Sequence, residues 1–132
     1  MEELYENRVK LSADPTPEEL AVFICRILYS KKARNIKLIK IDDKTSIADY
    51  FVLATGTSST HVRSLGDAVE FFTSKFGVTP TRGEGRDNSA WTALDYSSSI
   101  VHIFNRESRE FYNLDKLYAD VEPIEVDYES ID

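Results

Sequence analysis

The stretch that decides the fold reads Tyr50-Phe51-Val52-Leu53-Ala54-Thr55-Gly56-Thr57-Ser58-Ser59. Residues 50–54 are all apolar or aromatic, which is the pattern of a strand covered on both faces. Residues 56–59 then supply a turn and a hydroxyl side chain that can cap a helix. The sequence therefore predicts a central strand that leads directly into a helix.

Downstream of this turn, apolar side chains recur at spacings of three and four residues, as in a helix that buries one face. The stripe consists of Val62, Leu65, Val69, Phe72 and Phe76. Gly77 follows it and suits a left-handed C-cap. We expect this helix to be the crossover that links the central strand to a later strand of the same sheet.

Upstream, Thr16 and Pro17 predict the start of another helix, with Thr16 as N-cap and Pro17 in the first turn. This helix is expected to end near Lys32. Its apolar stripe consists of Leu20, Phe23, Ile24, Ile27 and Leu28.

The remaining patterns are short and β-prone, apart from a capped helix near the end. We expect strands at 36–41 and 78–82, a mobile loop at 83–88, a hairpin of 91–96 and 100–104 joined by 97–99, a helix from Asn105 through Tyr112, and a helical turn around Leu114 and Leu117. The fold class predicted is therefore α/β, a mixed β-sheet of about five strands flanked by helices.

The length of 132 residues suits one domain. We expect a loose N-terminal segment at 1–15, a folded domain at 16–119 and an acidic tail at 120–132. From Glu122 onward the tail holds Pro123 and clustered acids, which give it nothing to bury, so we expect it to be dispensable for folding.

The net charge of −7 is unevenly distributed. Residues 120–132 hold six acidic and no basic residues, which leaves residues 1–119, with 16 basic and 17 acidic residues, at −1. No basic stripe with interleaved aromatic residues is present, so sequence-specific recognition of nucleic acid is not expected. A basic protein partner fits the acidic tail.

Location is also constrained by the sequence. No apolar run approaches the roughly 20 residues of a membrane span, and the first residues lack a signal-peptide pattern. The one cysteine, Cys25, fits a reducing compartment. We expect a cytoplasmic protein without membrane contact.

The sequence contains little that indicates an enzyme. The turn at 56–59 could cradle an anion, but it lacks the lysine and spaced glycines of a phosphate-binding loop, so an ordinary turn is favoured. A nucleotidyltransferase would need paired carboxylates on one strand to hold two metal ions. Asp67 and Glu70 lie at helical spacing, and Asp95 stands alone near a strand end. We expect no catalytic residues, no metal and no cofactor; a nucleotidyltransferase-like enzyme or a nucleotide-binding protein is the alternative.

Trp91 follows the glycine-rich loop and could anchor either the core or an interface. Alternation places Trp91, Ala93 and Asp95 on one face of the strand and Thr92, Leu94 and Tyr96 on the other. His102 shares a strand face with Ile100 and Phe104, which favours a half-buried histidine with a satisfied hydrogen bond.

Two separated blocks resemble the ribosomal silencing factor (Iojap-like) family. The first runs from Ala48 to Val62 and contains the strand and turn quoted above. The second consists of Gly83-Glu84-Gly85, Trp91, Leu94-Asp95-Tyr96, Val101-His102-Ile103-Phe104 and Arg109-Glu110-Phe111-Tyr112-Asn113-Leu114. Together they cover roughly residues 17–120 in the family's order.

The resemblance implies a nucleotidyltransferase-like α/β fold without the catalytic carboxylates, often homodimeric. It further implies binding to the large ribosomal subunit through ribosomal protein fourteen, which blocks association with the small subunit and represses translation. We predict that the contact lies in the second block, where polar and aromatic residues concentrate. The predicted partner-binding residues are Glu84, Trp91, Asp95, Tyr96, His102, Phe104 and Tyr112.

Overall fold

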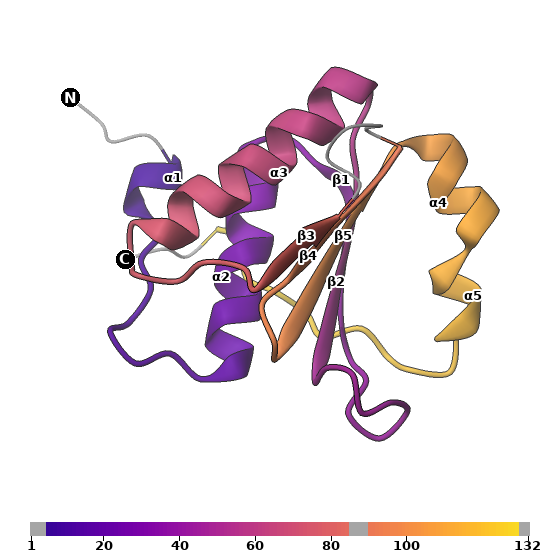
Figure 1. The fold of residues 1–132 in the computed structure, drawn as a ribbon, viewed down its shortest axis with the longest axis horizontal. Helices are drawn as coiled ribbons and strands as arrows, with labels where there is room; N and C mark the ends of the chain where they lie inside the picture. The colour runs from indigo at the N-terminus through magenta and orange to yellow at the C-terminus, as the bar shows by residue number, and fades with distance from the viewer. Residues whose placement is uncertain (1–4, 85–89, 130–132) are drawn as a thin grey trace.

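The computed structural model describes residues 5–84 and 90–129 and contains a mixed five-stranded sheet with helices on both faces (Figure 1). The strands are β1 Arg34–Lys40, β2 Tyr50–Thr55, β3 Arg82–Glu84, β4 Trp91–Asp95 and β5 Ser99–Phe104, in the spatial order β1-β2-β5-β4-β3. The predicted α/β class is confirmed.

Strand β2 lies inside the sheet, and all six of its residues are buried. It pairs antiparallel with β1 and parallel with β5, with Tyr50 opposite Ser99 and Thr55 opposite Phe104. A parallel pair needs a long crossover. Helix α3, Ser59–Ser74, begins that crossover, and β3, β4 and β5 follow as antiparallel neighbours. The predicted central strand and crossover are confirmed.

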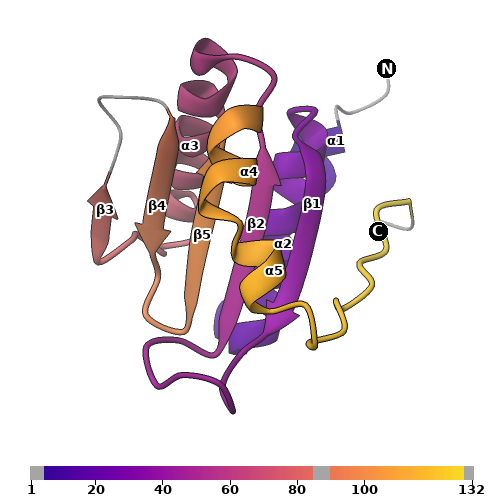
Figure 2. The ribbon, with the colours of Figure 1, turned by 90° about the vertical axis from the view of Figure 1, so that its right-hand side faces the viewer.

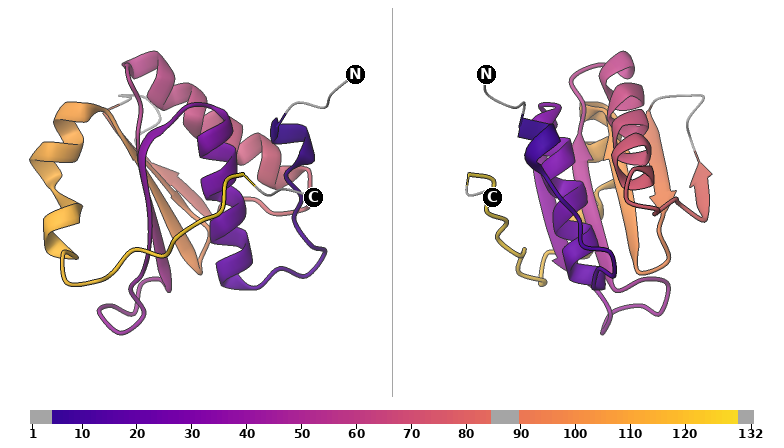
Figure 3. Two further views of the ribbon diagram at one scale, coloured as in Figure 1. Left: turned by 180° about the vertical axis from the view of Figure 1, so that it is seen from behind. Right: turned by 90° about the vertical axis from the view of Figure 1, so that its left-hand side faces the viewer.

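Helices α2, Pro17–Ser30, and α3 cover one face of the sheet (Figure 3). Thr16 and Glu19 form a reciprocal capping box at the start of α2, and Ser58 Oγ accepts from His61 N at 3.0 Å at the start of α3. Both helices begin where the caps predicted. Their apolar stripes form the larger core with the buried side chains of the sheet.

The opposite face carries two short helices, α4 Arg106–Tyr112 and α5 Leu114–Leu117 (Figure 2). They follow the positions expected from Asn105 onward. Beneath them lies a second, smaller core of Ile39, Ile41, Ala48, Phe51, Leu53 and Phe104. The sheet is therefore covered on both sides near its centre, which explains why β2 has no exposed residue.

The expectation of a loose N-terminal segment is wrong for residues 5–11. This part contains a short helix, α1 Tyr5–Arg8, followed by Val9 and Leu11, which are 3% and 7% exposed. The Tyr5 ring lies 5.5 Å from that of Tyr29 on α2. The few apolar residues here follow no helical or strand period, so the sequence pattern concealed their packing.

The expectation that the C-terminal tail buries nothing is also wrong. Val121 packs against the smaller core, Ile124 N donates to Leu38 O at 2.8 Å on the outer edge of β1, and Val126 and Tyr128 pack against the larger core. We call residues 121–128 the C-terminal strap, because they pass around the β1 edge from one face of the sheet to the other (Figures 2 and 3).

Near the other edge, residues 78–82 were expected to form a strand, but the strand is β3, Arg82–Glu84. Gly77 has φ +81°, the left-handed conformation expected after the helix, and the chain pairs with β4 only after Pro80. Residues 85–88 of the predicted loop lie outside the described residues. None of the described helices has the length and apolar character needed to span a membrane.

Candidate functional site

The sheet face that carries α4 and α5 is only partly covered. The two helices lie over β5, β2 and β1, whereas no described helix lies over β4 and β3 on this side (Figure 2). Trp91, Ala93 and Asp95 of β4 point to this side, and Arg82 of β3 is paired directly opposite Asp95. We call these four residues the open face; each retains some solvent exposure.

Trp91 is the anchor of the open face and is half-buried. Its ring stacks on Phe104 with centroids 5.2 Å apart and meets the Tyr112 ring of α4 at 4.4 Å. Its indole N–H donates to Nδ1 of His102 at 3.1 Å. Contacts on three sides hold the indole in one orientation, so it is ordered before any partner arrives.

His102 lies beneath Trp91 and is 7% exposed. Burial lowers the pKa of His102 to about 4, so the ring is neutral at pH 7. Since Nδ1 accepts from Trp91, the proton is on Nε2, which is buried and has no partner among the described residues. The predicted hydrogen bond is present on one ring nitrogen, but the ring is more deeply buried than expected.

The structure divides five of the seven predicted partner-binding residues into three groups. Trp91 and Asp95 lie on the open face, and Tyr112, 49% exposed, lies at its border. His102 and Phe104 lie beneath them as support. These two cannot meet a partner directly while Trp91 covers them.

The prediction that Tyr96 binds the partner is wrong. It is 6% exposed, belongs to the larger core, and its hydroxyl lies 2.9 Å from Thr73 Oγ1 of α3. The strand alternation that places Trp91 outward directs Tyr96 to the opposite face, so it cannot reach the same partner. Glu84 forms a backbone pair with Ala93, while its side chain lies outside the described residues.

Two exposed apolar residues beside this region were not predicted as binding residues. Phe111 is 80% exposed and its ring lies 5.0 Å from that of Tyr112, and Leu117 of α5 is 68% exposed. The available signal was the adjacent pair Phe111-Tyr112 on a helix too short to bury both rings. Large exposed aromatic side chains are typical of binding surfaces.

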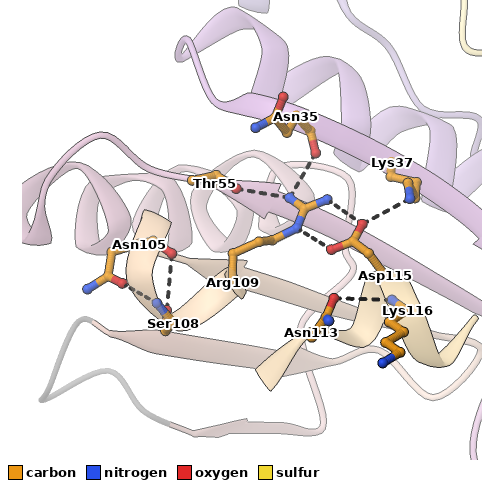
Figure 4. Close-up of polar contacts among 9 residues, drawn as sticks. All are labelled: Asn35, Lys37, Thr55, Asn105, Ser108, Arg109, Asn113, Asp115 and Lys116. Carbon is orange, nitrogen blue, oxygen red and sulfur yellow. Dashed lines mark hydrogen bonds and ion pairs between the residues drawn. The ribbon is translucent and has the colours of Figure 1, made fainter. Parts of the chain in front are cut away.

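Arg109 fastens the two short helices to the sheet (Figure 4). Its Nη1 donates to Asn35 O and Thr55 Oγ1, both at 2.9 Å, while Nε and Nη2 donate to the Asp115 carboxylate at 2.8 and 3.0 Å. Lys37 Nζ adds an ion pair to Asp115 at 2.9 Å. The hydrogen bonds from Arg109, and then those from Lys37, hold the pKa of Asp115 far below its usual value.

Local caps fix the junction between α4 and α5, which we call the elbow. Asn105 Oδ1 accepts from Ser108 N at 2.8 Å at the start of α4, and Asn113, at φ +51°, ends α4 in the left-handed conformation and caps α5 (Figure 4). These caps place Tyr112 beside Trp91, so the elbow sets the border of the open face.

The turn at the end of β2 is held by His61. Nδ1 of His61 accepts from Thr57 N at 2.8 Å, and Nε2 donates to Lys31 O at 2.8 Å. A Cβ on Gly56 would lie 2.8 Å from a methyl of Val62, so only glycine fits this approach of turn to helix. The structure therefore gives His61 a role in positioning the turn.

Asp95, the one strand carboxylate considered for catalysis, accepts from Ser97 N at 2.8 Å within the hairpin turn. In the ranges 5–84 and 90–129, no three His, Cys, Asp or Glu side chains are grouped as metal ligands. The fold and site thus define a small α/β protein with an aromatic anchor on a partly uncovered sheet.

Comparison with known proteins assigns this small α/β protein to a family. The family model described as ribosomal silencing factor during starvation matches residues 14–132, and the chain belongs to this family. A relative named ribosomal silencing factor from Haemophilus influenzae is 34% identical over 76% of this chain and 98% of its own length. These names denote silencing factors of the ribosome and not enzymes.

Two further matches extend the comparison. A mouse protein named mitochondrial assembly of ribosomal large subunit protein 1 is 30% identical over 70% of this chain and 42% of its own length. A crystal structure of a Chromobacterium violaceum protein superimposes with a TM-score of 0.76, covering 88% of this chain and 92% of that one at 22% identity. The crystal structure supports the fold.

Proposed function

We propose that this chain binds the large ribosomal subunit in the cytoplasm through ribosomal protein fourteen and prevents the small subunit from joining. Family membership supports a role at the ribosome, and the name of the mouse relative refers to the large subunit. A factor at the surface where the subunits meet would repress translation by occupying space.

The observation that carries the proposal is the Trp91 anchor on the open face. Binding energy at protein interfaces is concentrated in a few ordered aromatic or arginine side chains surrounded by polar groups. Trp91 has Arg82 and Asp95 on the same face and exposed Tyr112 at its border. This composition fits a protein surface better than a small molecule, which would require a concave site.

The negative charge of the C-terminal residues supports the proposal that the partner is a basic protein. Six acidic residues at 120–132 give the chain most of its net charge of −7. Opposite charges at long range raise the rate at which two proteins meet and have a smaller effect on how long they stay together. The open face supplies the contact in this proposal, and the acidic C-terminal residues accelerate encounter.

Isolated ribosomal protein fourteen tests the contact directly. Calorimetry should detect binding between this chain and ribosomal protein fourteen. This chain should also sediment with free large subunits but not with joined ribosomes. Adding it before the small subunit should reduce joining. Absence of binding to ribosomal protein fourteen would overturn the proposed partner. Metal-dependent nucleotidyl transfer abolished by Asp95→Asn would favour the enzyme alternative.

The homodimer implied by the family resemblance remains a prediction. Sedimentation velocity over a range of concentrations tests it, and the same samples can be assayed for binding. If the dimer buries the open face, binding of ribosomal protein fourteen should fall as dimer accumulates.

A further inference from the structure

A second concave site lies apart from the open face, at the carboxyl end of β2. It has a volume of about 520 Å³. In open α/β sheets, ligands bind beyond the carboxyl ends of parallel strands, and β2 and β5 are the parallel pair here. The lining residues are Arg34, Asn35, Thr55, Gly56, Thr57, Arg106, Arg109 and Glu110.

The lining is positively charged, with three arginines and one glutamate. Arg109 is neutralised in large part by Asp115. The Arg34 guanidinium has no hydrogen bond or ion pair to another described residue. Arg106 approaches Glu110 at 3.8 Å, but the two side chains are 89% and 73% exposed, so this pair contributes little. Arg34 and Arg106 are therefore available to an anion.

The chemistry of the lining specifies what kind of anion fits. None of the eight lining residues is aromatic, so no ring is available to stack on a nucleobase. Guanidinium groups match the oxygens of a phosphate in a forked, bidentate geometry. The pocket can thus recognise a phosphate group without recognising the base attached to it.

The pocket is also preorganised. Arg109 ties the Asn35 carbonyl and the Thr55 hydroxyl together at its floor, and His61 fixes the Thr57 backbone at its wall. Arg34 enters from the start of β1 and Arg106 from the start of α4, so three distant segments of the chain converge here. The backbone of the site is therefore ordered before an anion binds, and the entropy cost of binding is confined to the exposed Arg34 and Arg106 side chains.

We propose that this arginine pocket binds a backbone phosphate of RNA. The identity of the ligand rests on the proposed function, because a protein seated on a ribosomal subunit meets RNA as well as protein. The pocket opens to solvent, and its two available arginines are exposed, so a polynucleotide can pass across it. Contact with phosphates alone agrees with the expectation, drawn from the sequence, that this chain does not recognise a nucleic-acid sequence.

The test uses the full chain and a fluorescein-labelled single-stranded RNA of about twelve nucleotides, a length that spans one typical site. Anisotropy is measured over a series of salt concentrations. Each phosphate contact contributes roughly 0.7 to the slope of log affinity against log salt for single strands. Arg34→Ala/Arg106→Ala should lower affinity at least about tenfold at low salt and reduce the slope by about 0.7 to 1.4.

A matched control removes the same charge elsewhere. Lys40→Ala/Lys75→Ala changes the far end of β1 and the C-terminal end of α3, and it should lower RNA affinity less than about threefold. The proposal is overturned if the arginine variant binds RNA like the parent, or if the lysine control loses as much affinity. ATP is then added as a competitor of the labelled RNA. If ATP displaces the RNA and its dissociation constant is lower than that of the RNA, the RNA assignment is overturned in favour of a free nucleotide.

The two proposals separate cleanly in the same set of variants. Arg34→Ala/Arg106→Ala should still bind isolated ribosomal protein fourteen, whereas Trp91→Ala should still bind RNA. Failure of ribosomal protein fourteen to bind any form would end the proposed function and leave the RNA result standing. If the double variant unfolds, Arg106→Ala alone carries the test, because its side chain is 89% exposed.

Discussion

The indole N–H of Trp91 donates to Nδ1 of His102 at 3.1 Å, and this bond joins a half-buried anchor to a ring that is 7% exposed. It fixes the orientation of the indole and the tautomer of the histidine together. A change in either residue is therefore transmitted to the other, which makes the pair the most informative place to perturb the open face.

Trp91→Ala should weaken binding to ribosomal protein fourteen by about 2 to 4 kcal/mol, or roughly 30-fold to nearly 1000-fold, because it removes the anchor. Calorimetry gives the affinity, and circular dichroism and thermal melting check the fold. Phe71→Ala on α3 is a control, since Phe71 is 57% exposed and lies on another element. A folded Trp91→Ala protein with parental affinity would remove Trp91 from the interface.

Stability should fall with acidification through His102. Its folded pKa of about 4 is below the usual 6.5, so the unfolded chain takes up a proton between these values and the folded chain does not. Stability from this group is intact above pH 6.5 and decreases by up to about 3 kcal/mol as pH falls to 4.

Denaturant titrations at pH 7, 5 and 4 measure this effect against His102→Gln. Glutamine stays neutral and can still accept from the Trp91 indole, so its stability should change less over the same range. Equal pH dependence in the two proteins would show that other groups account for acid sensitivity.

Arg109→Met should destabilise the fold by about 2 to 4 kcal/mol, because it leaves Asp115, Asn35 O and Thr55 without their shared donor. Arg109→Lys should recover only part of this loss, since an ammonium cannot form the same fork. Arg106→Met, three residues earlier on the same helix, should change stability by less than about 0.5 kcal/mol. Urea unfolding distinguishes these cases; similar losses for Arg106→Met and Arg109→Met would contradict the anchoring role.

Truncation after Glu122 should lower the melting temperature by roughly 10 °C, because it removes three partly buried side chains worth about 1 kcal/mol each. These side chains are Ile124, Val126 and Tyr128. Glu125→Ala, which changes an exposed residue of the same strap, should leave melting unchanged.

The same truncation should expose Cys25. Burial raises the pKa of this thiol to about 12, and Tyr128 is hydrogen-bonded to it. A thiol reagent should therefore react slowly with the parent and with Glu125→Ala, and rapidly with the truncated chain. An unreactive Cys25 and an unchanged melting temperature would mean that the strap is dispensable after all.

The parts of the fold that the sequence predicted correctly are those with regular periodicity. The apolar run at 50–54 locates β2, and the stripe from Val62 to Phe76 locates α3, which ends at Ser74, before Phe76. Thr16 and the turn at 56–59 locate the helix starts. Strand alternation also assigned Trp91 and Asp95 to the side opposite Tyr96.

What escaped prediction depends on contacts between distant residues. Ile124 pairs with Leu38 and Arg109 reaches Asn35, and no local pattern encodes either separation. The arginine pocket joins side chains from three segments, so the sequence offered only its turn at 56–59. Tyr96 was included with its neighbours because they share a motif, although the strand turns its side chain away.

The C-terminal strap has a consequence for self-association. An exposed strand edge offers unpaired N–H and C=O groups on which another chain can add a strand, and proteins protect such edges against aggregation. Ile124 occupies the outer edge of β1 with a backbone hydrogen bond to Leu38, and it follows Pro123, which has no N–H to offer. The strap thus shields this part of the β1 edge from the addition of another strand, and β3, at the opposite edge, offers a template of only three residues.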